Sequence, residues 1–278
     1  MPELPEVERG RRLAEAVATG RRIESVWCAD DPLVFDGVAP EDWRDAIEGR
    51  RVVAARRWGK QLWFALDRPP HPLFHFGMAG GFKTPASTPL QLKSGPREDA
   101  AVWPPRFLKI RLRFDDGGEL AMTDGRRLGR ILLRDDPQGE PPVAKLGFDP
   151  LLAMPPPKRF SELIRARGAN VKSLLLDQSF SAGVGNWIAD EVLYQAGIDP
   201  RRHATSLTDA EARRVRARLA GIVKRAVAAN ADDTRYPRTW LFHRRWGKRA
   251  GARTTRGERI EHTTIGGRTT AWVPAVQH

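Results

Sequence analysis

The chain changes character at Met154-Pro155-Pro156-Pro157, and this change limits the architectures open to it. Before this point, short apolar stretches alternate with polar residues, as in 108–114, a pattern typical of half-buried strands. After it, apolar residues recur at helical spacing. Consecutive prolines interrupt helices and strands alike, so we expect a linker here. The sequence therefore predicts an α+β protein with its strands in the first half and its helices in the second.

The first half is expected to begin with a helix, because Val7, Gly10, Ala14 and Val17 share one face and Gly20 can close it. Short strands follow at 23–28, 51–55, 61–66, 73–76 and 108–114, the last leading into a hairpin turn at 115–118. This pattern predicts an antiparallel β-sandwich flanked by helices in an N-terminal domain of residues 1–150. The Pro-, Ser- and charge-rich stretch 84–105 predicts a long mobile loop.

The second half is expected to hold helices at 160–164 and 171–176, then a Gly183-Val184-Gly185 turn with Asn186 as the N-cap of a further helix. Thr208 and Glu211 form a capping box at the start of a long basic helix. Residues 260–273 predict a hairpin that turns at Gly266-Gly267. We expect a helical domain at 151–235 and a separate C-terminal finger at 236–278.

The charge of the chain points to a polyanionic partner, since the formal net charge is +13. Nucleic acid is the first candidate and an anionic membrane the second. No apolar run approaches the roughly 18 residues of a spanning helix, and the start lacks the apolar core of a signal peptide. Cys28 is the only cysteine, which excludes intramolecular disulfides and favours a reducing compartment. One cysteine and six scattered histidines have no zinc-site spacing, so no metal is expected.

The opening Met1-Pro2-Glu3-Leu4-Pro5-Glu6 can carry chemistry. Because Pro2 is small, we expect removal of Met1, which leaves a secondary amine at the terminus. An α-amino group has a pKa of about 7.7–8.0, so a useful fraction is neutral and can attack an aldehyde carbon to form a Schiff base. Glu3 beside it can act as the acid or base. The alternative is that Pro2 and Pro5 only start a helix, whose dipole suits an early glutamate.

Other candidate residues also have two interpretations. Lys60 in a Gly59-Lys60 turn is either a solvated charge or a catalytic one. Asn186 is either a helix cap or part of a phosphate site at a helix N-terminus. Met78 stands between glycines, where it could fill a core or wedge into a base stack. Arg126-Arg127-Leu128 predicts an exposed loop with two cations and an apolar tip.

Together these segments resemble the formamidopyrimidine-DNA glycosylases and their endonuclease VIII-like relatives. The resemblance rests on the opening octapeptide, on His75-Phe76-Gly77-Met78-Ala79-Gly80, on Asp124 to Gly129, on Asp177 to Glu191, and on Gly266 to Thr270. It spans nearly the whole chain in the family's order, and it is closest to the plant and fungal type, whose finger binds no zinc. The family fold implied is a catalytic β-sandwich, a helix–two-turn–helix domain and a zincless finger hairpin.

The resemblance implies a role for each matching residue. Pro2 would be the Schiff-base nucleophile at the anomeric carbon, Glu3 the acid/base, and Glu6 a residue close to the sugar. Lys60 would assist the first elimination, and Arg268 the second strand cleavage or a flanking phosphate. The backbone phosphates would be held by Arg127, Arg167, Lys172 and Asn186, and the gap left by the everted nucleotide would be filled by Met78, Arg126 and Leu128.

Three features depart from the family pattern. Leu128 stands where the family has phenylalanine, and the loop between Asn230 and Trp240 is short. The four finger cysteines are absent, at positions near Ala250, Arg253, Val273 and Val276. We therefore expect the finger to fold around an apolar cluster in place of zinc, built from Trp240, Leu241, Phe242, Ile260, Ile265, Trp272 and Val273.

The function expected is that of a base-excision-repair DNA glycosylase with abasic-site lyase activity, removing formamidopyrimidines and related oxidised bases. Its partner would be double-stranded DNA with oxidised bases or abasic sites, and we expect a monomer without cofactor or membrane association. The place of action would be the bacterial cytoplasm at the nucleoid, or the nucleus of a eukaryote. Two alternatives stay open: a non-catalytic DNA-damage binder on the same fold, and an RNA-binding protein with a similar helical hairpin.

Overall fold

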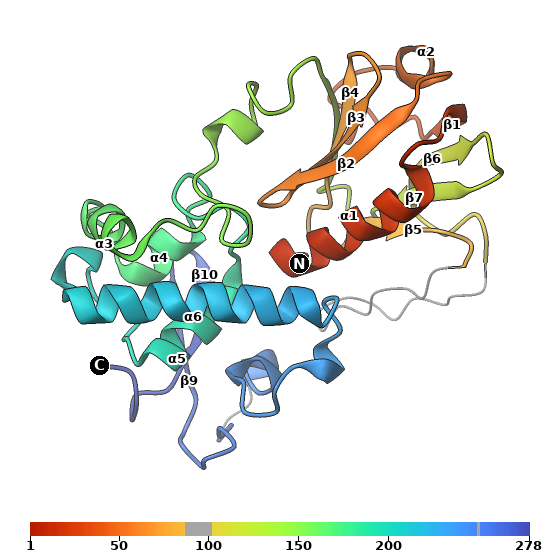
Figure 1. Ribbon diagram of the computed structural model, residues 1–278. Helices are drawn as coiled ribbons and strands as arrows, with labels where there is room; N and C mark the ends of the chain where they lie inside the picture. The colour runs from red at the N-terminus through yellow and green to blue at the C-terminus, as the bar shows by residue number, and fades with distance from the viewer. Residues whose placement is uncertain (87–101, 249–250) are drawn as a thin grey trace. The chain divides into compact units, whose positions relative to one another are not determined.

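The computed structural model describes residues 1–86, 102–248 and 251–278, and it divides the chain into two compact units, Met1–Lys145 and Leu146–His278 (Figure 1). The first unit is rich in strands and the second in helices, which confirms the predicted α+β class. Most of the loop predicted at 84–105 lies outside the described residues. The three-domain division at 150 and 235 stays a prediction.

The first unit contains two four-stranded antiparallel sheets within its described residues, with strand orders β1-β6-β7-β5 and β2-β3-β4-β8. The predicted β-sandwich is thus confirmed. Its elements are α1 (Leu4–Ala18), β1 (Ile23–Cys28), α2 (Pro40–Ile47), β2 (Val52–Trp58), β3 (Gln61–Leu66), β4 (His71–His75), β5 (Gly81–Lys83), β6 (Leu108–Phe114), β7 (Glu119–Thr123), β8 (Arg130–Arg134) and the 3-10 turn η1 (Val143–Lys145). Helix α2 is an addition to the prediction: it is only eight residues long and buries two side chains, Trp43 and Ile47.

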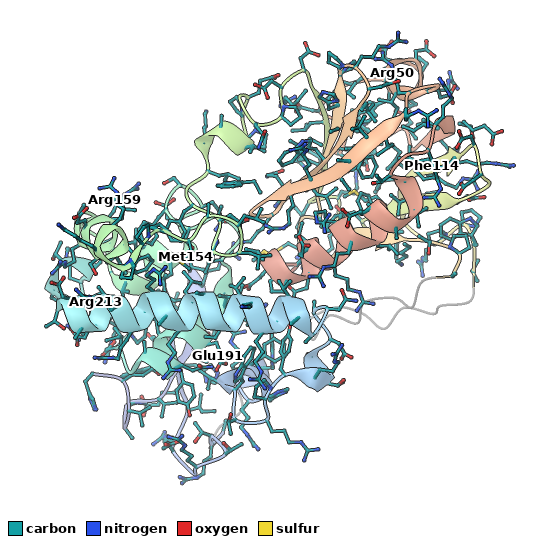
Figure 2. The ribbon with its side chains drawn as sticks, in the orientation of Figure 1. Arg50, Phe114, Met154, Arg159, Glu191 and Arg213 are labelled. Carbon is teal, nitrogen blue, oxygen red and sulfur yellow. The ribbon has the colours of Figure 1, made fainter. Side chains whose placement is uncertain are left out.

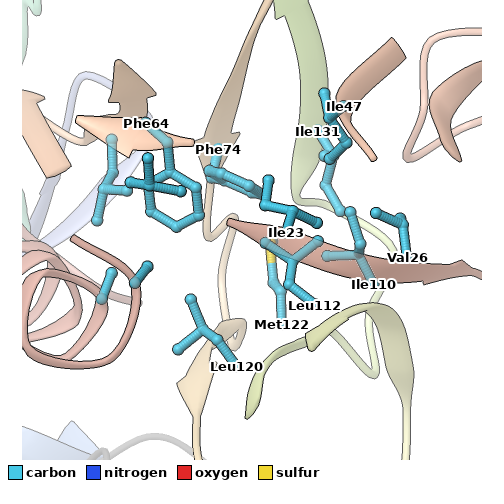
Figure 3. Packing of buried hydrophobic residues seen from close by; sticks show 14 of the residues in the cluster. Ile23, Val26, Ile47, Phe64, Phe74, Ile110, Leu112, Leu120, Met122 and Ile131 are labelled. Atoms are coloured by element: carbon cyan, nitrogen blue, oxygen red, sulfur yellow. The ribbon is translucent and has the colours of Figure 1, made fainter. Parts of the chain in front are cut away.

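The core of the first unit lies between the two sheets, as Figure 3 shows. The alternation in β6 places Ile110, Leu112 and Phe114 inside, where they join Phe64 and Phe74 of the other sheet. Helix α1 packs on β2 and β3 of one sheet and on β5 and β7 of the other. It buries a narrow stripe that includes Val7, Ala14 and Ala18. The N-terminus is therefore carried by a helix that both sheets hold.

Two glycines allow close approaches near this helix. A Cβ on Gly10 of α1 would lie 2.7 Å from the ring of Phe76. Gly77 has a φ of +59°, and a Cβ there would lie 2.5 Å from the backbone nitrogen of Gly129. The 75–80 loop thus packs between α1 and the 124–129 loop, and only glycine fits at both contacts.

The second unit consists of helices and one hairpin in its described residues. Its elements are α3 (Pro157–Arg165), α4 (Val171–Leu176), α5 (Asn186–Ala196), α6 (Asp209–Ala228), β9 (Glu261–Ile265), β10 (Arg268–Trp272) and the 3-10 turns η2 (Ala204–Ser206), η3 (Asp233–Arg235), η4 (Leu241–His243) and η5 (Trp246–Lys248). Helix α6 packs on α3 and α5, and α5 also contacts α4 and β10. Basic side chains such as Arg159 of α3 and Arg213 of α6 are exposed on this unit (Figure 2).

Local signals in the second unit are mostly confirmed. Thr208 and Glu211 make the predicted capping box of α6, and β9 and β10 pair as a hairpin that turns at 266–267. The prediction for Asn186 is wrong by one residue, because Gly185 is the N-cap of α5 and Asn186 is its first helical residue. The Asn186 side chain donates instead to the carbonyl of Thr269, at 2.8 Å. None of the helices in the described ranges has both the length and the apolar character needed to cross a membrane.

The contact at Gly77 leads to a testable prediction. Gly77→Ala should lower the free energy of unfolding by about 1–3 kcal/mol, because the new Cβ meets fixed backbone and the residue has a positive φ. Gly81→Ala is the matched control, since its Cβ would meet nothing within 4 Å. Urea unfolding of both variants measures the effect, and equal stabilities would contradict the close approach of the two loops.

Candidate active site

The N-terminal segment forms a buried, hydrogen-bonded start to α1. Pro2 is buried, and Glu3 and Glu6 are only 2% and 8% exposed. Oε2 of Glu6 accepts the Glu3 backbone N–H at 2.9 Å, which holds the residues before the helix. Pro5 lies in the first turn of α1, so the helix-starting role open to it from sequence is present as well. Glu3, predicted as the acid/base, and Glu6, predicted to lie close to the sugar, are therefore neighbours beside the terminus.

Burial of the terminus favours a neutral amine. Burial lowers the pKa of the α-amino group, here that of Met1, and the nearby cations Arg126 and Lys60 lower it further against the opposing effect of Glu3 and Glu6. Burial, with repulsion from Glu3, raises the pKa of Glu6 to about 7. A neutral amine and a protonated carboxyl can therefore exist together near pH 7.

Lys60 is held next to this segment by a buried ion pair. Nε of Arg57 on β2 lies 3.0 Å from Oε2 of Glu8 on α1, and the Arg57 side chain is fully buried. The same guanidinium donates to the carbonyl of Gly59 at 2.9 Å, one residue before Lys60. The pair thus ties the β2–β3 turn to the helix that carries the terminus.

The predicted wedge residues Met78 and Leu128 lie on the 75–80 and 124–129 loops, which contact each other. Met78 is half-buried and Leu128 is 46% exposed, and the glycine contact described above joins their loops. His75 accepts the Gly77 N–H through Nδ1 at 3.3 Å. Burial, with the charges of Lys60 and Arg130, lowers the pKa of His75 to about 4, so the ring is neutral. Sequence reasoning gave His75 no role, although it stands in the same motif as Met78.

Arg126 and Arg127 are both exposed on the 124–129 loop, and Arg127 is held in an ion pair. Arg127 makes an ion pair with Asp31, whose role the sequence did not suggest, at 3.0 Å. Burial alone would raise the pKa of Asp31, but its hydrogen bonds from Arg127 and Lys109 bring that pKa down to about 2. Asp31 is therefore a carboxylate at all ordinary pH values.

Three residues predicted to bind phosphate or assist elimination lie in the second unit. Two of them are exposed, and the third links a helix to the hairpin. Arg268 is exposed at the start of β10, next to the hairpin turn. Asn186 links α5 to β10 through the Thr269 carbonyl. Arg167 is exposed, and its Nη1 lies 3.4 Å from Asp177 Oδ2 and 3.4 Å from Ser179 Oγ. Arg167 and Arg268 are thus both exposed, as a phosphate contact would require, while Asn186 holds the hairpin.

Lys172 requires a correction, because its side chain is fully buried and cannot reach a phosphate. Nζ binds Asp190 Oδ1 and donates to the Asn186 carbonyl at 3.2 Å. The other carboxylate oxygen, Oδ2, accepts from Arg245 Nη2 at 2.6 Å and from the Ala271 N–H at 3.1 Å. A desolvated lysine requires a close counter-charge, and Asp190 of α5 supplies it.

The apolar cluster predicted for the finger is confirmed in part. Leu241, Ile260 and Val273 pack together with Ala271, against Val276. Trp240 and Phe242 pack elsewhere, against Trp187 and Tyr236. The Arg201 guanidinium carbon lies over the Trp272 ring, 4.2 Å from the ring centroid. Val273 and Val276, near two of the positions where the family has cysteines, thus do make apolar contacts.

Within the described ranges, no group of three or more His, Cys, Asp or Glu side chains could hold a metal ion. The carboxylates described above are instead paired with cations or with backbone N–H groups. Since the terminal amine can supply a nucleophile and the glutamates a proton, the arrangement is suited to covalent amine catalysis.

Comparison with known proteins places this arrangement in a family. The model of the formamidopyrimidine-DNA glycosylase N-terminal domain matches residues 1–131, and that of the formamidopyrimidine-DNA glycosylase H2TH domain matches 146–237. A formamidopyrimidine-DNA glycosylase of Arabidopsis thaliana is 40% identical over 277 residues, which cover 100% of this chain and 71% of that protein. The chain belongs to the formamidopyrimidine-DNA glycosylase family.

Other members of the formamidopyrimidine-DNA glycosylase family agree with this assignment. The enzyme of Thermus thermophilus is 32% identical over 289 residues, covering 100% of this chain and 98% of its own. The crystal structure of the Lactococcus lactis enzyme bound non-covalently to DNA containing an AP site has a TM-score of 0.79, 25% identity and 99% coverage of both chains. A structure of MutM in complex with DNA containing carbocyclic 8-oxo-G has a TM-score of 0.80, 25% identity and full coverage of both chains.

The environment of Glu6 predicts a pH dependence of stability. Because its folded pKa of about 7 lies above the ordinary value of 4.5, its protonated form stabilises the fold, and this contribution is full below pH 4.5 and lost as the pH rises through 7. Glu6→Gln should remove the loss, so the variant should gain about 2–3 kcal/mol relative to the native chain between pH 4.5 and 8. Urea unfolding at both pH values measures this difference. A constant difference would show that Glu6 is not desolvated.

The ion pairs of Asp190 with Lys172 and Arg245 predict that the C-terminal finger is held in place without a metal ion. Asp190→Asn should destabilise the protein by about 3–5 kcal/mol, because it leaves Lys172 and Arg245 buried without their carboxylate. Glu162→Gln is the control, as it removes an exposed ion pair with Arg159 and should cost less than about 1 kcal/mol. Thermal melting with and without a strong chelator completes the test, and a melting temperature lowered by the chelator would contradict the metal-free finger.

Proposed function

We propose that this protein is a DNA glycosylase of base excision repair that also cleaves abasic sites as a lyase, through a Schiff base at Pro2. The observation that carries the proposal is the buried terminus, where desolvation lowers the pKa of the α-amino group and so favours a neutral amine beside Glu3 and Glu6. Family membership and the likeness to relatives solved with lesion-containing DNA support the substrate class. A protein that only bound damaged DNA would need neither the amine nor the protonated carboxyl.

The first step uses the amine of Pro2, exposed by removal of Met1. The amine attacks the anomeric carbon of the damaged nucleotide, the new N–C bond forms, and the bond from that carbon to the base breaks. The base leaves with the electron pair of that bond and takes up a proton, and the new ammonium nitrogen gives up its own proton to a nearby carboxylate or to water. Opening of the sugar ring, with a proton delivered by Glu3, produces the Schiff base. Because α1 is packed on both sheets, the nucleophile is mounted on a rigid element.

Lyase activity follows from the same intermediate. The positively charged Schiff base acidifies the adjacent carbon, so a proton can be removed there and the neighbouring phosphate leaves with the electron pair. Lys60, held by the Arg57–Gly59 bond, would assist this first elimination. Arg268 would assist the second cleavage or hold a flanking phosphate. Water then hydrolyses the Schiff base and restores the amine.

The duplex must be opened for this chemistry, since the anomeric carbon is otherwise shielded. Met78 and Leu128, supported by the Gly77–Gly129 contact, would fill the gap left by the everted nucleotide, and Arg126 would face the orphan base. Arg127, Arg167 and Asn186 would bind or support phosphates of the backbone. Lys172 has no part in this proposal, because it is buried against Asp190.

The Schiff base makes a direct prediction. Borohydride should trap the protein covalently on duplex DNA carrying an abasic site, because reduction of the Schiff base leaves a stable amine linkage. A protein with an uncleaved N-terminal tag should lose at least about 100-fold in trapping, in keeping with the usual contribution of a catalytic group. Denaturing gel electrophoresis measures the trapped fraction.

The matched control is the same tagged protein after cleavage to leave Pro2 at the terminus, and a C-terminal tag should have no effect. Pro2→Gly keeps a primary amine and should keep part of the trapping. Equal trapping by the blocked and unblocked proteins would assign the nucleophile to another amine. Tight binding of abasic DNA without any trapping would favour the non-catalytic damage binder.

A further inference from the structure

The 124–129 loop is folded on the side chain of Asp124. Its Oδ1 accepts the Arg126 N–H at 3.0 Å and its Oδ2 accepts the Gly129 N–H at 2.6 Å. Arg127 at the tip has a φ of +55°, in the left-handed region that non-glycine residues rarely adopt. The tip Arg126–Leu128 is therefore held in one defined shape and stays exposed.

Asp31 holds this tip from a distant part of the chain. Arg127 Nε donates to Asp31 Oδ2 and Nη2 donates to Oδ1, each at 3.0 Å, across 96 residues of sequence. This two-bond fork fixes the plane of the guanidinium as well as its position. Within the described residues the third nitrogen of the group, Nη1, has no hydrogen-bond partner and is left to donate elsewhere. The Arg127 side chain is 55% exposed.

The burial of Asp31 does not by itself require Arg127. Lys109 Nζ already lies 2.7 Å from Asp31 Oδ2, with a side chain only 12% exposed, and supplies a counter-charge. The carboxylate also accepts the Val34 N–H at 3.3 Å. An ion pair as exposed as that of Arg127 contributes little to stability. Its evident effect is on the conformation of the tip.

We propose that Asp31 is a positioning residue, which holds Arg127 so that Nη1 can donate to a phosphate of the duplex and Leu128 stays directed at the opened base stack. The proposal rests on the proposed function, because it assigns Asp31 a part in binding lesion-containing DNA. A guanidinium already held in place loses less conformational freedom on binding than a free one. Asp31 would thus raise the affinity for DNA although its own charge repels it.

The positioning role of Asp31 and simple electrostatics predict opposite changes in DNA affinity when the carboxylate is removed. Removal of a carboxylate from a DNA-binding surface should strengthen binding, since the phosphates then meet a more positive protein. Removal of a positioning residue should weaken it. The double variant Asp31→Asn/Lys109→Met separates the two effects, because it removes one negative and one positive charge and leaves the net charge unchanged. It also leaves no buried lysine without its carboxylate.

The first measurement is the affinity for a duplex with a tetrahydrofuran abasic analogue, by fluorescence anisotropy at several salt concentrations. The double variant should bind about tenfold more weakly than the native protein, as expected for the loss of one pre-ordered side chain. Its salt slope should fall by about one, since one phosphate contact is lost. Lys109→Met alone keeps the fork and should stay within about twofold. Equal or tighter binding by the double variant would overturn the proposal.

A thermodynamic cycle tests whether Asp31 acts through Arg127. In an Arg127→Ala background, the Asp31→Asn/Lys109→Met changes should have no further effect on affinity, because there is no guanidinium left to position. A merely structural role of Asp31 would weaken binding equally in both backgrounds, and that result would contradict the proposal.

Amide hydrogen exchange of the free protein provides a readout that needs no DNA. The Arg126 and Gly129 amides, bonded to Asp124, should exchange about tenfold faster in the double variant than in the native protein and in Lys109→Met. Unchanged exchange would show that Asp31 does not hold the tip. Native protein that failed to bind the abasic duplex would overturn the proposed function, and the exchange rates would still decide whether Asp31 orders this loop.

Discussion

The buried ion pair between Glu8 and Arg57 is the interaction on which the catalytic geometry of the first unit depends. Removal of one partner of such a pair leaves an uncompensated buried charge and typically costs about 3–5 kcal/mol. Here the pair also fixes geometry, because Arg57 bonds the Gly59 carbonyl beside Lys60 while Glu8 belongs to the helix that carries the terminus. The terminal segment and Lys60 are thus joined through one buried ion pair. The charge of Lys60 in turn lowers the pKa of the terminal amine.

Close backbone contacts extend this arrangement to the residues proposed to open the duplex. Gly10 lets Phe76 rest on α1, and Gly77 lets the 75–80 loop touch the 124–129 loop. The loops that carry Met78 and Leu128 are therefore supported by the same helix as the N-terminal segment. Asp31 adds a lateral hold on the second loop. Rigid support of this kind keeps a reacting group within the small tolerance that catalysis requires.

Two kinds of contact hold the hairpin of the second unit. An apolar cluster around Leu241, Ile260 and Val273 closes the base of the hairpin. Asp190 joins α4, α5 and β10 through Lys172, Arg245 and the Ala271 N–H, as a zinc ion would join its ligands, but with the charges reversed. Glu191 on the next position of α5, labelled in Figure 2, accepts the Phe242 N–H at 2.8 Å, and burial raises its pKa to about 7. The finger is fastened to α5 by neighbouring carboxylates that face different segments.

The sequence by itself determined the features that depend on near neighbours. The alternation of 108–114, the capping box of Thr208 and Glu211, the Gly266-Gly267 turn and the family motifs all act over a few residues, and the structure has each of them. Helix α2 was not predicted, because it is only eight residues long and buries only two side chains. Only the tertiary structure decided where the charged groups go. Lys172 could be a phosphate ligand or a buried cation, and Arg127 could be free or held, until Asp190 and Asp31 were placed beside them from 18 and 96 residues away. Local propensity is encoded in adjacent residues, whereas the partner of a charge is chosen by packing, which brings distant segments together and removes the water that would otherwise solvate it.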